Sequence, residues 1–264
     1  MKTRAPSVIF IIIMFLMAIS VSAQNSRYLL LEYIKLKTNS NNAYPLIENT
    51  CGKIQIQKQI DSTLLGCSIW KVVSSPDNHT SYHYIVATIF SDFSAYLEQY
   101  ESRNTQKIFV QMADDSLKTV LERNADSFEV IHVQVYEVLA ETGSATYLPK
   151  YMLCTDVKAA PGKRMAYESQ EMQHWLPIHK DLIRKGFESA FNFSRLIYPS
   201  DINFPYDYSV FCFFEDESMY SKRRKIDWDD YIQKKQGAFV NAGALRTEVH
   251  SELLSLVAFL DDGR

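Results

Sequence analysis

Apolar runs recur with the same spacing in the two halves of this 264-residue chain. The first run of each half is apolar at nearly every position, which indicates a strand that is covered on both faces. Shorter aromatic and β-branched runs follow, and polar segments without strand alternation separate the runs. The predicted strands span residues 28–36, 67–74, 82–90 and 130–140, then 151–159, 190–198, 206–214 and 253–260. The predicted helices span residues 43–62, 93–123, 165–185 and 218–244.

The two halves also match residue by residue, which indicates an internal duplication. Residues 28–76 align with 151–199 without a gap, and the match resumes one inserted residue later, where Tyr82 aligns with Tyr206. Each half therefore has the order β-α-β-β-α-β of a ferredoxin-like unit. Helices cover one face of such a sheet, and strands that are apolar on both sides cannot leave the other face in water.

The predicted fold is therefore α+β, with two tandem ferredoxin-like (βαββαβ) repeats packed sheet to sheet as one intramolecular α/β barrel. We expect the repeats at residues 24–148 and 149–264.

The first residues have the pattern of a secretory signal peptide, residues 1–23. Lys2 and Arg4 precede an unbroken apolar run at 8–19, and the small residues at 21–23 suit cleavage after Ala23. A membrane-spanning helix needs about 20 apolar residues, so an uncleaved anchor is the weaker interpretation. We expect an exported, periplasmic or extracellular protein with no stable membrane insertion after cleavage.

The charge balance excludes some partners. The chain has 28 basic and 31 acidic residues, a formal net charge of −3 at pH 7. This balance gives no support to a nucleic-acid or anionic-membrane partner. Aspartates follow at once after the one basic cluster, Lys222–Lys225, so we expect a solvated helix face there.

All four cysteines lie after the predicted cleavage site, at Cys51, Cys67, Cys154 and Cys212. Export would expose them to an oxidising environment, where pairing can occur. Cys154 and Cys212 lie on predicted neighbouring strands, so a disulfide between them and a pair of buried free thiols are both open. No cysteine shows the spacing of a metal site, and neither do His79, His83, His132 and His250, so we predict no metal.

One stretch of the second half carries a distinctive series of motifs. They read Lys158-Ala-Ala-Pro161-Gly162, Tyr167, Trp175-Leu-Pro177-Ile-His179, Pro199 and Tyr206-Asp-Tyr208. This series resembles exported bacterial tandem-repeat proteins of unknown function within the dimeric α/β-barrel superfamily. That superfamily includes antibiotic-biosynthesis-type monooxygenases, haem-degrading monooxygenases and NIPSNAP-like proteins. The resemblance implies an intramolecular version of the dimeric barrel with a pocket between sheet and helices, and it implies no single reaction.

Trp175 and His179 are the residues with the strongest case for chemistry. They are four residues apart, so they lie on one side of a continuous helix, although Pro177 between them predicts a kink or a new helical segment. The first half has Cys51, Gly52 and Ile56 in place of His174, Trp175 and His179. Any site built from these side chains is therefore single and belongs to the second half.

Two interpretations of these residues stay open. In the first, His179, with His174, transfers a proton or ligates haem in an aromatic pocket shaped by Trp175. In the second, Trp175 packs against the sheet and His179 makes one hydrogen bond at the helix surface. The Asn, Trp and His set of haem-degrading relatives is matched only by Trp175 and His179, so haem is a candidate cofactor without a complete motif.

The remaining candidate ligand-binding residues are Tyr167, Tyr206, Tyr208 and Arg195. The tyrosines of each Tyr-x-Tyr pair are expected to face the same side of their strand. They suit either a cavity for a flat apolar ligand or an ordinary barrel core. Glu171 has a counterpart in the first half, Glu48, which indicates a structural ion pair, with Arg195 as one candidate partner.

The chain has no Gly-rich phosphate loop, Gly-x-Ser-x-Gly elbow or His-Glu-x-x-His motif. The leading hypothesis is an exported protein that binds a small apolar or aromatic molecule in a barrel pocket. A cofactor-independent or haem-dependent monooxygenase-like enzyme is the first alternative, and a structural component of the cell envelope is the second. The sequence leaves the ligand, the oligomeric state and any catalysis open.

Overall fold

The computed structural model describes residues 27–37, 64–75, 82–94, 128–143, 149–201, 203–236 and 244–261. The predicted signal peptide and the helix predicted at 43–62 lie outside these ranges, as does the helix predicted at 93–123 beyond Ser94. No helix within these ranges is long and apolar enough to cross a membrane.

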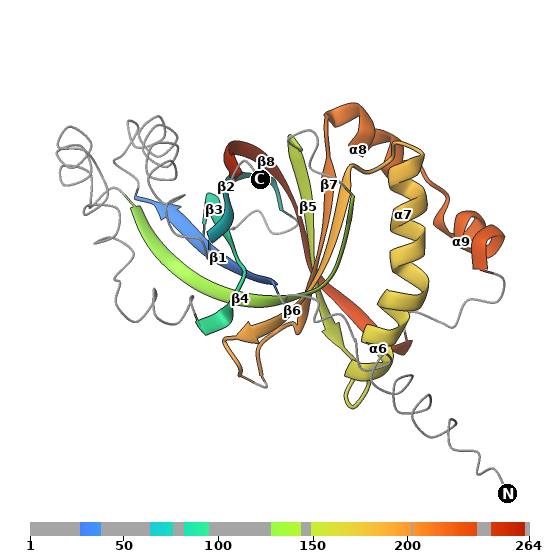
Figure 1. Cartoon of the computed structure of the whole chain (residues 1–264), viewed down its shortest axis with the longest axis horizontal. Helices are drawn as coiled ribbons and strands as arrows, with labels where there is room; N and C mark the ends of the chain where they lie inside the picture. The colour runs from blue at the N-terminus through green and yellow to red at the C-terminus, as the bar shows by residue number, and fades with distance from the viewer. Residues whose placement is uncertain are drawn as a thin grey trace, which may run out of the picture.

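Eight antiparallel strands close into a barrel in the order β1-β3-β2-β8-β5-β7-β6-β4 (Figure 1). The strands are β1 (Arg27–Leu36), β2 (Leu64–Ser74), β3 (Tyr84–Phe90), β4 (Phe128–Gly143), β5 (Tyr151–Ala159), β6 (Ala190–Tyr198), β7 (Tyr208–Phe214) and β8 (Arg246–Asp261). The α+β class is confirmed, and β5 and β6 begin and end where the apolar pattern predicts. The strand order of the first half, β4-β1-β3-β2, is the same as that of the second half, β8-β5-β7-β6.

Two long strands close the barrel. β4 and β8 have 16 residues each, more than any neighbouring strand. This length lets β4 pair with β1 and then with β6, while β8 pairs with β5 and then with β2. The strands of the two halves are therefore joined by hydrogen bonds along both edges into one closed sheet.

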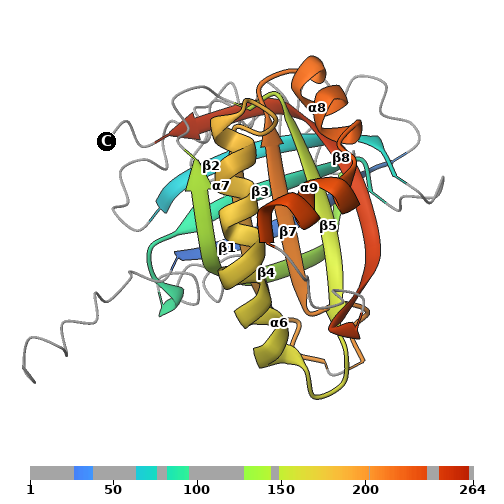
Figure 2. The same ribbon diagram turned by 90° about the vertical axis from the view of Figure 1, so that its right-hand side faces the viewer.

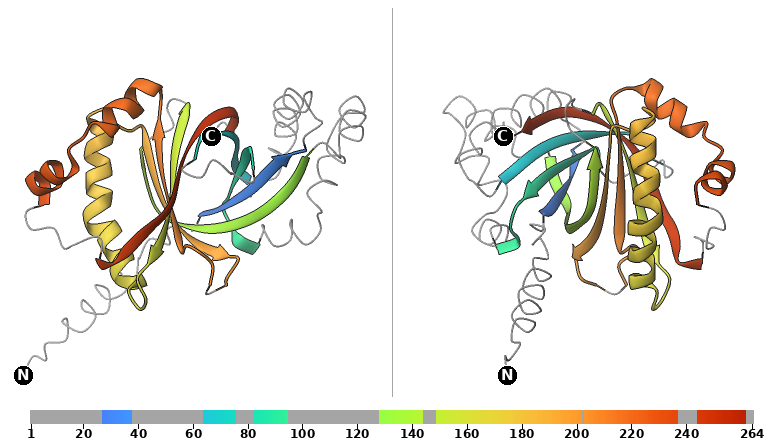
Figure 3. Two further views of the ribbon diagram at one scale, coloured as in Figure 1. Left: turned by 180° about the vertical axis from the view of Figure 1, so that it is seen from behind. Right: turned by 45° about the vertical axis from the view of Figure 1, so that its right-hand side comes forward.

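The described helices beyond Ser94 all lie in the second half and cover the outside of its sheet (Figures 2 and 3). They are α6 (Arg164–Gln170), the π-helical turn η2 (Glu171–Trp175), α7 (Leu176–Arg184), α8 (Glu217–Arg224) and α9 (Trp228–Gln236). α6, η2 and α7 follow one another without a break and confirm the helix predicted at 165–185. Gly186, at φ +69°, ends this helix in a conformation that glycine adopts without strain.

The sheet separates two buried cores because successive strand residues point to opposite faces. The lumenal core lies inside the barrel and draws on both halves: Leu29, Leu31, Tyr33, Trp70, Ile85, Ala87, Tyr136, Met152, Cys154, Phe211 and Leu254. The outer core lies under the helices of the second half: Ala140, Val157, Ala159, Tyr167, Phe191, Phe193, Tyr208, Val210, Cys212 and Phe214. A binding or catalytic site in the second half can therefore lie either in the barrel lumen or between the sheet and the helices.

This separation decides the question left open about Cys154 and Cys212. The two residues lie on paired strands, but Cys212 is opposite Leu153, and Cys154 is opposite Phe211. One residue of offset puts the two thiols on opposite faces of the sheet. Both are buried free thiols, as is Cys67, whereas Cys51 lies outside the described residues.

The prediction that Tyr206 and Tyr208 face the same side is wrong. Tyr206 packs against the lumenal core and Tyr208 belongs to the outer core. The same split separates Tyr82 from Tyr84. In each pair the first tyrosine precedes the strand, where the strict alternation of a strand does not apply.

Candidate functional site

The helix that carries Trp175 and His179 changes its winding just before Pro177. η2 ends at Trp175, and Pro177 lies in the first turn of α7. The wider turn accommodates the break predicted at Pro177 without ending the helix. Single π-helical turns of this kind re-aim side chains and occur frequently at functional sites.

His179 is held in a buried group with Glu188, Arg223 and Cys212. The imidazole Nδ1 lies 2.7 Å from Glu188 Oε2, and Arg223 Nε donates to Glu188 Oε1 at 2.5 Å. Arg223 Nη2 lies 3.5 Å from Cys212 Sγ. His179 is 4 % exposed and Glu188 1 % exposed, so the hydrogen bond of His179 lies in the core and not at the helix surface.

The charges in this buried group depend on burial, on the bond between His179 and Glu188 and on Arg223. Burial alone would raise the pKa of Glu188, but the hydrogen bond from His179 and the charge of Arg223 outweigh it, so the pKa lies below its usual value. Burial lowers the pKa of His179, and the bond to Glu188 offsets this only in part. The group therefore holds a carboxylate, a guanidinium and a neutral imidazole that donates from Nδ1.

His179, Glu188 and Cys212 also have the donor types of a zinc site. Their ligand atoms lie within 4.8 Å of one another. Arg223, however, already contacts both Glu188 and Cys212, and burial raises the pKa of the Cys212 thiol, so the sulfur stays protonated. The donors thus hold a guanidinium, and this arrangement does not fit a metal ion.

Haem does not fit at His179 either. The imidazole stacks on Phe191 with ring centroids 3.8 Å apart and an interplanar angle of 16°. Its Nδ1 is bound to Glu188, and only 4 % of the residue is exposed. A side chain this deeply buried leaves no exposed room for a group of the size of haem.

Glu171 pairs with Arg246, so the suggestion of Arg195 as its partner is wrong. Arg246, at the start of β8, donates to Glu171 Oε1 at 2.8 Å and to the Tyr167 hydroxyl at 3.2 Å. Its guanidinium also lies 5.3 Å from the Trp175 ring centroid. Arg195 instead faces its cross-strand partner Glu137, because the register of β4 and β6 places the two residues side by side.

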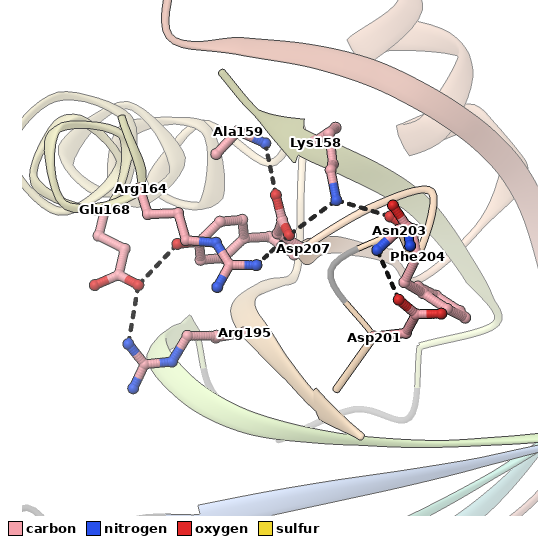
Figure 4. Close-up of polar contacts among 10 residues, drawn as sticks. Lys158, Ala159, Arg164, Glu168, Arg195, Asp201, Asn203, Phe204 and Asp207 are labelled. Atoms are coloured by element: carbon pink, nitrogen blue, oxygen red, sulfur yellow. Dashed lines mark hydrogen bonds and ion pairs between the residues drawn. The ribbon is translucent and has the colours of Figure 1, made fainter. Parts of the chain in front are cut away.

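Arg195 belongs to a polar cluster at the end of β5 (Figure 4), and Tyr208 is bound to the same cluster. Glu168 accepts from Arg195 at 3.0 Å and from the Tyr208 hydroxyl at 2.9 Å. Beside them, Asp207 accepts from the following groups: Lys158 Nζ at 3.2 Å, the Ala159 amide at 3.1 Å and Arg164. Burial would raise the pKa of Asp207, but these bonds outweigh it and lower the pKa. The acidic and basic side chains of this cluster are paired with one another. We therefore infer a structural role for the cluster, which connects the segment before β7 to β5 and α6.

An aromatic row crosses from η2 to α9 and consists of Trp175, Trp228 and Tyr231. Successive ring centroids are 6.3 and 6.1 Å apart. Both tryptophans are half-buried. Arg246 lies over Trp175 at 5.3 Å from the ring centroid, and Arg223 lies over Trp228 at 5.1 Å, so each indole has a cation over one of its faces.

The row ends at a shallow groove where α8 and α9 meet the turn after α7; Figure 2 shows how these helices lie together. Its lining consists of Phe187, Lys222, Lys225, Ile226, Asp227, Asp230 and Tyr231. Asp230 is paired with Lys234 at 2.6 Å, and Asp227 accepts from the Asp230 amide at the start of α9. With Asp230 paired to Lys234, the groove lining carries two lysine charges against the one carboxylate of Asp227.

The structure brings some of the predicted site residues together and separates others. Trp175, His179 and Tyr167 lie around Arg246 and Glu188, and His174 is half-buried on η2 beside them. Tyr208 and Arg195 lie in the separate cluster at the end of β5, and Tyr206 lies on the other side of the sheet.

Sequence reasoning missed the partners of His179 and Trp175. The cluster Lys222–Lys225 is not wholly a solvated face, because the Arg223 side chain is only 15 % exposed. The signal was helical spacing: Arg223 follows Met219 by four residues, and Met219 packs against the outer core. Glu188, Arg246 and Trp228 had no such local signal.

No known family profile matches the chain, and no curated protein does. Its structure is similar to a putative monooxygenase from Fusobacterium nucleatum (TM-score 0.53, 10 % identity, 89 % of this chain and 94 % of that one). It is similar to another from Lactobacillus acidophilus (0.53, 10 %, 90 % and 97 %) and to an anthrone oxidase-like protein (0.54, 10 %, 90 % and 94 %). At this identity the likeness is one of fold, and it supports the dimeric α/β-barrel architecture implied by the sequence resemblance.

Proposed function

We propose that this protein binds a small, flat aromatic anion on the outer side of its second half, in the groove between α8 and α9. The aromatic row of Trp175, Trp228 and Tyr231 supplies stacking surfaces, and Lys222 and Lys225 supply the charge for the anionic group. In this proposal the barrel is a rigid scaffold of two ferredoxin-like repeats, residues 24–148 and 149–264. The shared strand order of the two halves supports the repeat architecture.

The observation that carries the proposal is the way the row is anchored. Arg223 and Arg246 lie over the two indoles and are themselves bound to the buried carboxylates Glu188 and Glu171. Side chains fixed in this way lose little conformational entropy when a ligand stacks on them. A pre-organised aromatic surface beside a cationic groove suits a flat molecule with an acidic group.

Binding is favoured over oxygenation because of where His179 lies. Its ring stacks on Phe191 with its centroid 6.3 Å from that of Trp175, and only 4 % of the residue is exposed to an incoming substrate. A general acid or base must come within hydrogen-bond reach of the reacting atoms. The structural neighbours that are called monooxygenases therefore support the fold on which this proposal rests, and they do not support an oxygenase reaction in this protein. Export remains part of the proposal and is supported by the pattern of residues 1–23.

Indole resonances test the proposal in the chain without residues 1–23. The protein has three tryptophans, and Trp70 lies in the lumenal core as an internal control. Addition of 2-naphthoate is expected to shift the indole N–H signals of Trp228 and Trp175 and to leave that of Trp70 in place. Each signal is assigned from a Trp→Phe variant.

Two comparisons make the test specific. Cyclohexanecarboxylate, an anion without a π face, is expected to bind at least about tenfold more weakly, a loss that corresponds to one good stacking contact. The variant K222Q/K225Q is expected to lose the preference for the anion over neutral 2-naphthol. If naphthoate shifts no indole signal, or shifts Trp70 as much as Trp228, the proposed site is wrong.

A further inference from the structure

A chain of hydrogen bonds crosses the barrel lumen, on the opposite face of the sheet from the proposed binding groove. Asp156 Oδ1 lies 2.5 Å from Ser209 Oγ, which lies 3.0 Å from the Tyr136 hydroxyl. The Tyr136 hydroxyl is 2.8 Å from Gln134 Oε1, and the Gln134 amide nitrogen contacts the Tyr206 hydroxyl. Asp156, Gln134 and Tyr136 are at most 5 % exposed, and Tyr206 is the half-buried end of the chain.

The protonation state of Asp156 decides which group donates each hydrogen bond in this series. Ser209 has a single hydroxyl hydrogen, so it can donate to Asp156 or to Tyr136 but not to both. When Asp156 is ionised, Ser209 must donate to it, and the hydrogen between Ser209 and Tyr136 must come from Tyr136. When Asp156 is protonated, it can donate to Ser209, which then donates to Tyr136.

Gln134 allows both directions because its amide group can turn over. With its carbonyl toward Tyr136, it accepts from Tyr136 and also from Tyr33, whose hydroxyl is 2.7 Å away, and its NH2 donates to Tyr206. With the amide reversed, the NH2 donates to Tyr33 and Tyr136, and the carbonyl accepts from Tyr206. Both arrangements keep every contact of Gln134 a hydrogen bond.

We propose that Asp156, Ser209, Tyr136, Gln134 and Tyr206 form a two-state hydrogen-bond relay whose direction is set by the protonation of Asp156. No proton crosses Gln134, since only its amide turns. With Asp156 ionised, Tyr206 donates inward and presents an acceptor at the edge of the lumen. With Asp156 protonated, Tyr206 accepts from Gln134 and presents its O–H outward as a donor.

The groups around Asp156 make both states accessible. The titratable groups that face it are Cys154 on β5, His250 and Glu252 on β8, Tyr33 on β1, Tyr136 on β4, and Tyr82 and Tyr206 ahead of β3 and β7. His250 is the cross-strand neighbour of Asp156 and lies 3.5 Å from Glu252. Lys158, two residues along β5, is bound to Phe204 and Asp207 instead.

Burial raises the pKa of Asp156 to about 7; the bond from Ser209 opposes this rise, and the charge of Glu252 adds to it. Both protonation states are therefore populated near neutral pH. Burial also raises the pKa values of Tyr33 and Tyr136, so these phenols remain neutral donors throughout that range.

Side-chain nuclear magnetic resonance of the chain without residues 1–23 tests the relay. The carboxyl carbon of Asp156 and the side-chain amide of Gln134 are followed between pH 5 and pH 9, with assignments from D156N and Q134E. The two signals are expected to titrate with the same midpoint, and D156N is expected to abolish the response of the Gln134 amide. A Gln134 amide that does not move while Asp156 titrates would overturn the relay.

Three further variants separate the relay from a general effect of charge. S209A removes the link, so Asp156 is expected to titrate while the Gln134 amide no longer follows it. E252Q removes a neighbouring carboxylate outside the relay, so the common midpoint is expected to move to lower pH with the two signals still coupled. H250Q is expected to keep the coupling, and coupling that vanishes in H250Q would assign the response to His250 and overturn the proposal.

Discussion

The two faces of the second-half sheet bury carboxylates in opposite ways. On the outer face, Glu188 is 1 % exposed and is bound to the guanidinium of Arg223. On the lumenal face, Asp156 is 5 % exposed and is bound to the hydroxyl of Ser209. The pKa of Glu188 lies below its usual value, whereas burial raises that of Asp156 to about 7.

The hydrogen bond from His179 and the charge of Arg223 together keep Glu188 ionised, whereas Asp156 has no cation bound to it among the described residues. A bound cation is not sufficient by itself, because burial raises the pKa of Glu171 to about 7 although Arg246 binds it. The outer charge is permanent and holds α7 and α8 against the sheet through His179 and Arg223. The lumenal charge changes near neutral pH. The proposed binding surface therefore lies on the same face as the fixed charge, and the titratable network lies on the other face.

The largest expected effect comes from removing the outer cation. In R223M the carboxylate of Glu188 stays buried without its partner, which costs about 3–5 kcal/mol of stability. Urea unfolding at pH 7 measures the loss. R224M is the matched control, because Arg224 is the adjacent, exposed residue of the same helix and is expected to change stability by less than about 0.5 kcal/mol.

The double variant E188Q/R223M tests the same ion pair. It removes both charges and should recover much of the stability lost in R223M. Equal losses in the single and the double variant would show that packing of the arginine side chain, and not its charge, dominates at this site.

The lumenal acid should behave in the opposite way. The folded-state pKa of Asp156, about 7, lies above the value of about 3.9 for an unfolded chain, so the folded protein holds the extra proton. The contribution of Asp156 to stability is thus fully present below about pH 4 and is lost as pH rises through about 7. The loss amounts to roughly 4 kcal/mol in total, at about 1.4 kcal/mol per pH unit.

D156N isolates this contribution, because an amide resembles the protonated acid in shape and in its ability to donate. The variant is expected to be more stable than the wild type at pH 8 and close to it at pH 4, as measured by urea unfolding across that range. A stability difference that stays the same at every pH would mean that Asp156 does not take up a proton in the folded protein.

The smallest effect is expected where the ion pair is accessible to water. Arg195 binds Glu137 and Glu168 with distances much like those of Arg223, but 38 % of its side chain is exposed. Solvent screens such pairs, so R195M is expected to cost about 0.5–1 kcal/mol, well below R223M. Thermal unfolding of the two variants side by side measures the contrast, and a loss in R195M as large as in R223M would contradict the role assigned to burial.

Local pattern was enough to predict most of the second half. The apolar runs predicted β5 and β6 in full, and Pro161-Gly162 and Gly186 marked the two ends of the helix from α6 to α7. Pro177 marked the place where that helix changes its winding. Errors arose where a segment had no regular structure, as at Tyr206, because period-two alternation holds only within a strand.

The partners of the site residues were beyond such reasoning. Trp175 and His179 could be selected because the first half lacks them, but Arg246 reaches Glu171 from 75 positions along the chain and Arg223 reaches Glu188 from 35. Contacts at these separations depend on which strands become neighbours and on their register, and no short window of sequence contains that information.

The sequence by itself determined the order of the eight strands and the place of the helix from α6 to α7, because hydrophobic periodicity and turn residues act locally. Tertiary structure alone decided which side chains share a face and which acids receive a cation. A one-residue offset between β5 and β7 places Cys154 in the lumen and Cys212 under the helices. The closed barrel likewise buries Asp156 beside a hydroxyl and Glu188 beside a guanidinium, and that difference in neighbours fixes their charge.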